Sequence, residues 1–85
     1  MGYSLYILRS KVSDKYYTGI SQNPSVRLKY HNTKEKGFTS RYRPWENVYT
    51  KEIENKAEAM DAEKKVKKWK SKKMIEKLIR GEIEI

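Results

Sequence analysis

The absence of cysteine most strongly limits what this chain can fold into, because it removes disulfide bonds and cysteine-bound zinc as sources of stability. A chain of 85 residues has room for one small domain, whose core must therefore consist of packed side chains. Aromatic residues make up 12% of the sequence and favour a folded domain over a disordered chain. We expect a single domain over residues 1–81 and a short, frayed tail over residues 82–85.

The first third of the chain predicts two strands and a helix. Residues 4–9 (SLYILR) form an apolar run typical of a strand buried on both faces, and residues 15–20 (KYYTGI) form a second β-prone run. The polar stretch between them is short enough for an antiparallel hairpin. Asn23 caps a helix that begins at Pro24, where proline loses no hydrogen bond, and continues to about Asn32. Residues 33–44 lack a sustained period and are expected to form a surface loop.

The remaining sequence predicts one strand and two helices. Residues 46–54 show a mixed alternation, with Val48 on one face and Tyr49 and Ile53 on the other, which favours a third strand. Asn55 caps an amphipathic helix, and Ser71 caps a second one that ends before Gly81. The expected fold class is therefore α+β, with a small three-stranded antiparallel sheet flanked by helices in the order β-β-α-β-α-α.

The net charge of +9 predicts a polyanionic partner. Eight lysines lie between positions 64 and 77, and their spread around the helix suits phosphate attraction or simple solvation; the overall charge favours nucleic acid. In the predicted loop, cations alternate with aromatic side chains, as in proteins that hold phosphates and stack on bases, although Trp45 is expected in the core. The candidate nucleic-acid contacts are Arg41, Arg43, Lys64, Lys67, Lys68 and Lys70.

The sequence favours a cytoplasmic protein without a membrane partner. No apolar run approaches the roughly 18 residues of a spanning helix, and the first residues lack the basic and apolar order of a signal peptide. The predicted helices use their apolar faces for the core and so offer no bulky face for membrane insertion.

Five further side chains are candidates for a cleft. Tyr6 and Tyr17 lie on the two predicted neighbouring strands, and Arg27 and His31 share one helix face because they are one turn apart. Glu63 lies at the border of the apolar stripe of a later helix. Each residue alone also suits an ordinary structural role: tyrosine is common in strands, histidine is often half-buried, and a border glutamate is usually solvated.

Taken in order, these residues resemble the GIY-YIG nuclease domain. The resemblance is carried by Ser4-Leu5-Tyr6, by Tyr17-Thr18-Gly19, by Arg27 and His31 four residues apart, and by Glu63. It extends from about residue 3 to residue 79 and is closest to the small stand-alone members and to the N-terminal domain of the excinuclease incision protein. The family includes homing endonucleases, repair incision subunits and flap or junction nucleases. The resemblance implies a three-stranded antiparallel sheet with flanking helices.

The resemblance also implies a reaction, namely hydrolysis of a DNA phosphodiester with one divalent cation, Mg²⁺ or Mn²⁺. It implies Tyr17 as the leading general-base candidate and Tyr6 as a phenol that positions phosphate or water. Arg27 would bind the phosphate, His31 would support by hydrogen bonding, and Glu63 would be the metal ligand. One carboxylate is enough for Mg²⁺ because water and substrate phosphate fill its other positions.

Two positions depart from the family pattern. Ile20 stands where many catalytic members have a lysine, and no asparagine equivalent is found near Ile75. The expected substrates are branched, nicked or single-stranded DNA, with target specificity coming from DNA shape, from the predicted loop over residues 33–44 or from a protein partner. The alternatives are a non-catalytic nucleic-acid-binding module that uses the same basic cleft, and a nuclease that acts on RNA.

Overall fold

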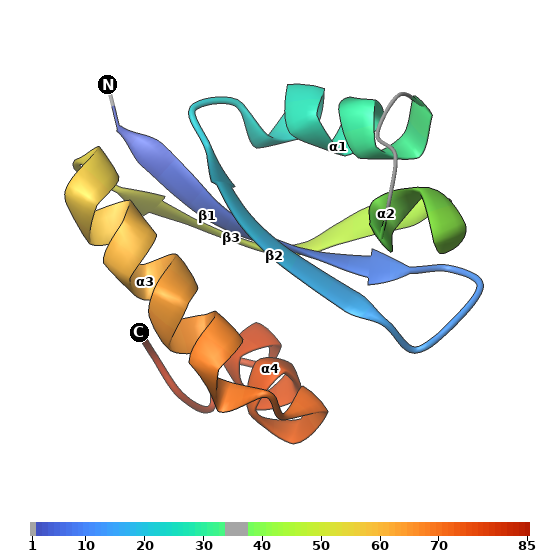
Figure 1. Cartoon of the computed structure of the whole chain (residues 1–85). Helices are drawn as coiled ribbons and strands as arrows, with labels where there is room; N and C mark the ends of the chain where they lie inside the picture. Colours follow the sequence, from blue (N-terminus) through green and yellow to red (C-terminus); the bar gives the residue numbers. More distant parts are fainter. Residues whose placement is uncertain (1, 34–37) are drawn as a thin grey trace.

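The computed structural model describes residues 2–33 and 38–85 and consists of a three-stranded antiparallel sheet between two layers of helices (Figure 1). The elements are β1 (Tyr3–Ser10), β2 (Tyr16–Ser21), α1 (Pro24–Thr33), α2 (Phe38–Arg41), β3 (Trp45–Ile53), α3 (Lys56–Trp69) and α4 (Lys72–Ile79). The strand order is β2-β1-β3, so β1 is the central strand. The predicted α+β class and the order of the main elements are confirmed.

The central strand builds two separate cores because its side chains point to opposite faces in turn. Leu5 and Ile7 pack with Val66 of α3 and Leu78 of α4. Tyr6 and Leu8 point to the opposite face, where α1 and α2 lie. All four of these β1 side chains are at most 1% exposed, as predicted for a strand buried on both faces. Truncating such an aliphatic side chain to alanine typically costs about 2–5 kcal/mol.

The predicted caps define the ends of the C-terminal helices. The Asn55 side chain accepts the backbone N–H of Glu58 at 2.9 Å, and Ser71 accepts that of Met74 at 3.4 Å. Gly81 follows α4 with a φ of 79°, in the left-handed region that glycine occupies without strain. The end of α3 was not predicted: Lys70 adopts φ 50° there, a conformation that lets the chain turn sharply into α4.

A β-bulge in β3 explains the mixed alternation of its sequence. Ile7 pairs with Tyr49 and Leu8 pairs with Asn47, so Val48 is the extra residue. The extra residue lets Val48 pack against the same core cluster as Tyr49, and the prediction that they lie on opposite faces is wrong. The bulge also turns Trp45 to the α1 face, where it is 2% exposed and buried as expected.

Polar groups hold α1 against the sheet. Its one buried side chain is His31, and the Asn32 amide bridges to the backbone of Trp45. The amide oxygen accepts the Trp45 N–H at 2.6 Å, and the amide nitrogen donates to the Trp45 carbonyl at 3.1 Å. The arrangement fixes the C-terminal end of α1 over the start of β3. A buried backbone group that loses its hydrogen-bond partner typically costs about 1–3 kcal/mol.

Two regions differ from the sequence expectation. The stretch predicted as a loop contains the one-turn helix α2, and the part of that stretch at residues 34–37 lies outside the described residues. The tail expected to fray instead packs on the core through Ile83 and Ile85, and Lys51 donates to the Ile85 carbonyl at 2.8 Å. Apolar burial of the two isoleucines explains why the tail stays against the domain. Within the described ranges, no helix is long and apolar enough to cross a membrane.

Candidate active site

The two tyrosines of the candidate site lie side by side on the α1 face of the sheet. Tyr6 belongs to β1 and Tyr17 to β2, and the register places Gly19 opposite Tyr6. The centres of the two phenol rings are 6.4 Å apart with an angle of 39° between their planes. Tyr6 is 1% exposed, whereas Tyr17 is only partly buried. The two phenols therefore lie in different environments, one enclosed and one accessible.

Gly19 is required by the position of the Tyr6 ring. A Cβ atom at position 19 would lie 2.6 Å from the Tyr6 hydroxyl oxygen and 2.8 Å from Cζ, closer than side-chain atoms approach one another. The Tyr6 ring is buried and hydrogen-bonded, so it has little freedom to move away. The glycine of the Tyr17-Thr18-Gly19 motif thus provides the space in which the first tyrosine lies.

Tyr6 is connected to both predicted residues of α1. Its hydroxyl lies 3.0 Å from His31 Nε2 and is also hydrogen-bonded to the Arg27 guanidinium. Because arginine has only donors, the Tyr6 oxygen accepts from Arg27 and its own proton is available to His31. Burial raises the pKa of Tyr6 above its ordinary value of 10.0, and the field of Tyr17 adds to this while Arg27 opposes it. Tyr6 therefore stays protonated at neutral pH.

His31 lies behind the two phenols, between the sheet and α1. Its ring centre is 4.7 Å from that of Tyr17, and the imidazole is 1% exposed. Its backbone carbonyl accepts a hydrogen bond of 2.7 Å from Arg43 Nε. A residue so enclosed is suited to position the phenols rather than to touch a substrate.

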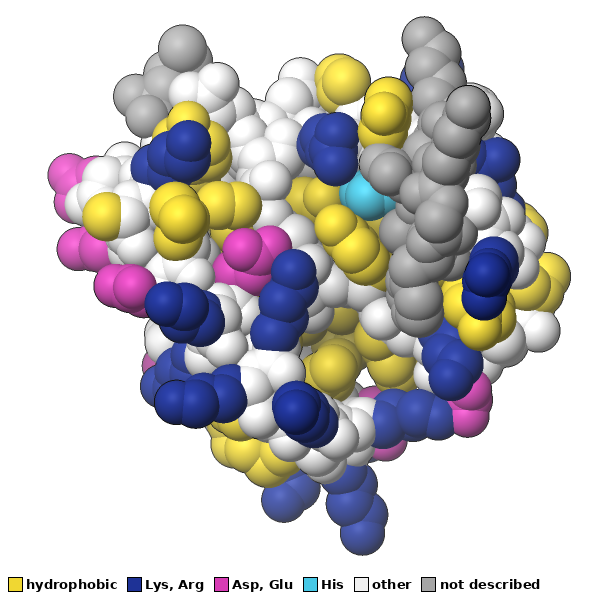
Figure 2. All heavy atoms as spheres, viewed as in Figure 1, with side chains coloured by type: hydrophobic (Ala, Val, Ile, Leu, Met, Phe, Trp, Pro, Cys, Tyr) yellow, Lys and Arg dark blue, Asp and Glu magenta, His cyan; other side chains and the backbone are white. Residues whose placement is uncertain are grey.

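Arg27 reaches the same face from one turn earlier in α1. Its guanidinium carbon lies 4.9 Å from the centre of the Tyr30 ring, a distance typical of a cation–π contact. The stacking restricts the orientation of a side chain that also contacts Tyr6. Figure 2 shows one basic side chain next to the cyan histidine side chain.

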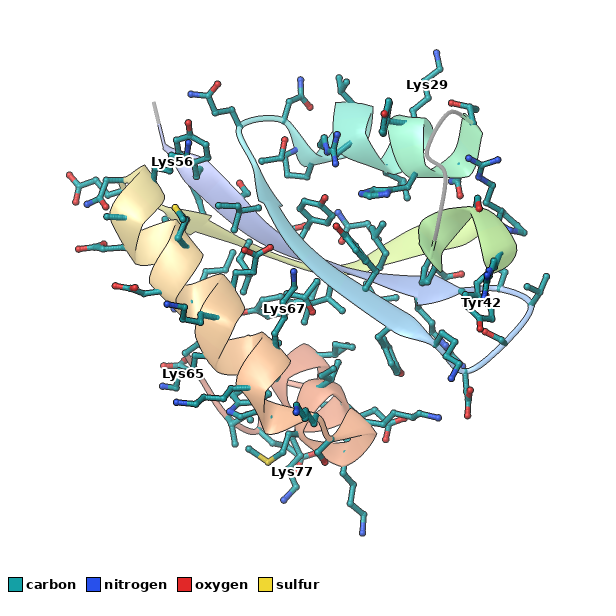
Figure 3. The ribbon with its side chains drawn as sticks, viewed as in Figure 1. Lys29, Tyr42, Lys56, Lys65, Lys67 and Lys77 are labelled. Atoms are coloured by element: carbon teal, nitrogen blue, oxygen red, sulfur yellow. The ribbon has the colours of Figure 1, made fainter. Side chains whose placement is uncertain are left out.

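Glu63 lies on α3, the helix that packs against β2. Its field contributes to the raised pKa of Tyr6, and its carboxylate pairs with Lys67 at 3.2 Å. The Lys67 ammonium also lies 5.8 Å from the centre of the Tyr17 ring. Figure 3 shows Lys67 extending from α3 toward β2. Lys67 thus connects the carboxylate to the accessible phenol, which links α3 to the tyrosine pair.

The site suits a cation that needs few protein ligands. Among residues 2–33 and 38–85, no group of three His, Cys, Asp or Glu side chains is placed to hold a metal. Glu63 is an isolated carboxylate whose side chain is 24% exposed and already holds a cation, the ammonium of Lys67. Mg²⁺ is commonly held by one or two carboxylates, with water and phosphate as further ligands. Glu63 fits this requirement.

The predicted nucleic-acid contacts divide into three groups. Lys67 and Lys70 lie beside Tyr17, whereas Lys64 and Lys68 are exposed elsewhere on α3. Figure 2 shows basic side chains gathered over α3 and α4. Arg41 is exposed on α2, away from these lysines, and the Nε of Arg43 is used to hold the end of α1. The structure therefore brings only part of the predicted set to the tyrosines.

Sequence reasoning missed two features of this site. The contact between Lys67 and Glu63 was recognisable as an i,i+4 pair on one helix, but its approach to Tyr17 depends on how α3 packs against β2. Lys15 and Lys72 also lie near Tyr17, and neither belongs to a motif.

Comparison with known proteins gives one family match and two relatives. A family profile described as the GIY-YIG catalytic domain matches residues 2–77. The UPF0213 protein OB0043 of Oceanobacillus iheyensis is 39% identical over 64 residues, which cover 74% of this chain and 73% of that protein.

A second relative is much longer than this chain. The structure-specific endonuclease subunit SLX1 of Phaeosphaeria nodorum is 45% identical over 49 residues, which cover 52% of this chain and 13% of the fungal protein. The chain thus corresponds to a small part of that relative. No solved structure matches the chain.

Proposed function

Because this chain belongs to the GIY-YIG catalytic domain family, a family of nucleases, we propose that it is a divalent-metal-dependent endonuclease that hydrolyses phosphodiester bonds of DNA. The proposal is supported by an enclosed phenol, an accessible phenol and a guanidinium that lie together, and by a carboxylate on α3 that pairs with the lysine nearest the accessible phenol. These groups come from β1, β2, α1 and α3. A domain that served only as a scaffold would have no need to place Arg27 and Glu63 around Tyr6.

The environments of the two phenols support different roles. Tyr6 stays protonated, so it donates or positions but does not accept a proton at neutral pH. Tyr17 is the better candidate for a general base, because it is accessible and the Lys67 ammonium favours its phenolate form. In the proposed reaction Tyr17 takes a proton from the attacking water as the water oxygen bonds to phosphorus. The phosphorus–oxygen bond to the leaving nucleotide then breaks, and the leaving oxygen takes a proton from solvent.

Arg27 and Glu63 would stabilise the charge that develops during this reaction. The Arg27 fork matches the geometry of phosphate oxygens, and its stacking on Tyr30 pre-orients it. Glu63 would hold the divalent cation, which supplies Lewis-acid stabilisation of the phosphoryl oxygens when bound. His31 would act as a positioning residue, since it contacts both phenols from a buried location.

The choice of target would depend on the shape of the DNA. The printed name of the fungal relative describes it as a subunit of a structure-specific endonuclease. We extend to this chain both parts of that description: a substrate defined by structure and a protein partner that directs cleavage. The net charge of +9 supports DNA binding without sequence preference.

The test is a cleavage panel with fluorescent flap, fork, nicked and fully paired DNA, alongside structured RNA, in Mg²⁺ or Mn²⁺. We expect cleavage of at least one DNA substrate. This cleavage should disappear when the metal is removed and in the Glu63→Ala variant. Salt-sensitive binding without cleavage of any substrate would instead support a non-catalytic module. Cleavage confined to the RNA would overturn the assignment to DNA. Lys65→Ala is a matched control, since it changes an exposed residue of the same helix.

A further inference from the structure

A hollow of about 300 Å³ is lined in part by Tyr17. It is formed where β2 meets the end of α3 and the start of α4. Its lining includes Tyr17 and three residues of the core cluster on the α3 side of the sheet, Tyr16, Val66 and Ile75. The volume is at the lower end of the range of small-molecule sites, about 300–1,000 Å³. An aromatic and aliphatic surface of this kind suits a flat, apolar group.

Four exposed lysines surround this apolar surface: Lys15, Lys67, Lys70 and Lys72. Lys72 pairs with Asp14, which also lines the hollow, and Lys67 pairs with Glu63. Lys70 makes no ion pair with any described residue. The hollow therefore offers positive charge around a partly apolar region that includes Tyr16.

We propose that this hollow binds an unpaired nucleotide of the DNA strand, with its base against the apolar lining that includes Tyr16 and its phosphate near Lys67 and Lys70. The combination of aromatic surface and lysines is the one by which proteins hold single strands. A base inside a duplex is excluded, because its faces are covered by neighbouring bases and its edge is paired. The inference rests on the proposed nuclease function and narrows it to DNA with unpaired nucleotides next to the cleaved bond.

The first experiment separates binding of bases from binding of phosphates. The full chain is titrated, in a chelator that removes divalent metal, with fluorescent oligothymidylate and with an abasic oligomer of equal phosphate number. We expect about ten-fold weaker binding of the abasic oligomer, within the range known for a stacked base. Equal affinity for the two oligomers would overturn the proposal.

Lys70→Gly tests the location without endangering the fold. Glycine suits the φ of 50° at this position, so the variant should be at least as stable as the parent protein. It should bind oligothymidylate several-fold more weakly, and its logarithmic salt dependence should fall by about 0.7 for one lost phosphate contact. Lys65→Ala removes the same charge from an exposed position of α3 that does not line the hollow. Equal losses in the two variants would contradict the proposed location.

Ile75→Trp tests whether the base enters the hollow. The larger ring should fill the space and abolish the difference between oligothymidylate and the abasic oligomer, while Lys70→Gly retains part of that difference. A folded Ile75→Trp protein that still prefers the oligothymidylate would overturn the proposal. The folded state is checked by circular dichroism, and an unfolded variant leaves the decision to the first two measurements.

These binding measurements fail separately from the nuclease assignment. Base-dependent binding without any metal-dependent cleavage would support the nucleotide site and contradict the proposed nuclease activity. Glu63-dependent cleavage with equal binding of the two oligomers would support the nuclease activity and contradict the nucleotide site. For an active enzyme with this site, flap and fork substrates should be cut faster than nicked duplexes.

Discussion

Lys67 and Glu63 form an ion pair of 3.2 Å at the point where α3 approaches the tyrosine pair. The same ammonium lies 5.8 Å from the centre of the Tyr17 ring, so one lysine contacts the proposed metal ligand and the proposed base. In this arrangement a divalent cation at Glu63 would compete with the Lys67 ammonium for the carboxylate. Once displaced, the lysine would remain close enough to the phosphate and to Tyr17 to stabilise negative charge there.

Replacing this lysine should strengthen metal binding and weaken catalysis. Lys67→Met removes the competing ammonium, and an exposed i,i+4 pair is worth about 0.3–0.5 kcal/mol, which corresponds to roughly two-fold tighter Mn²⁺ binding by calorimetry. Cleavage at neutral pH should fall, and its pH profile should move to higher pH because the Tyr17 phenolate loses a nearby cation. The control is Lys65→Met on the same helix. Weaker Mn²⁺ binding in Lys67→Met would contradict competition for Glu63.

The two tyrosines should respond differently to removal of their hydroxyls. Tyr17→Phe should reduce the single-turnover cleavage rate by about 10²–10⁴, the usual contribution of a general base. Tyr6→Phe should cause a smaller loss, because it disturbs Arg27 and His31 without removing the base. DNA binding in the absence of metal serves as the control for both variants. A Tyr17→Phe protein that cleaves at the parent rate would require another base.

Gly19→Ala should damage the site by displacing the Tyr6 ring. The new methyl group would lie 2.6 Å from the hydroxyl oxygen, and overpacking of this kind typically costs about 1–3 kcal/mol of unfolding free energy. Cleavage should fall as well, since Tyr6 would lose its position beside His31. Gly81→Ala is the matched control: its φ of 79° also disfavours alanine, but no atom lies within 4 Å of the added Cβ. It should therefore lose stability while keeping the cleavage rate of the folded protein.

Stability should fall at high pH because of three tyrosines. Burial raises the pKa of Tyr6, Tyr16 and Tyr49 above 10.0 in the folded protein. As pH rises, the phenols lose their protons in the unfolded chain before they lose them in the folded protein. The three tyrosines therefore contribute fully to the unfolding free energy below about pH 9. This contribution is lost as the pH rises past 10 toward their pKa values in the folded protein. Urea unfolding at about pH 9 and pH 11 measures this loss.

Tyr6→Phe provides the comparison for the pH experiment. It removes one of the three tyrosines whose pKa is raised. The fall in unfolding free energy between the two pH values should therefore be smaller than in the parent protein. An equal fall in the parent and Tyr6→Phe proteins would show that Tyr6 is not protected from ionisation.

Local sequence patterns were sufficient for most of the fold. The buried run around Leu5 and Ile7, the caps at Asn55 and Ser71, and the turn at Gly81 are all where the sequence indicated. Each depends on interactions within a few residues or on the period of one element, which a single sequence records directly. The family resemblance likewise depended on short motifs and their order, and the profile match over residues 2–77 confirms it.

Features that depend on contacts between two elements could not be predicted from local sequence patterns. The bulge at Val48 reverses the faces that strict alternation assigns, because it arises from pairing with β1. The sequence by itself determined which residues form strands and helices and which side chains are suited to phosphate chemistry. Only the tertiary structure decided that Lys67 lies over Tyr17, that Arg43 holds a carbonyl of α1, and that a hollow opens between β2 and the last two helices. The physical reason is that such contacts depend on how whole elements pack across the sheet. This packing is determined jointly by side chains that are far apart in the sequence.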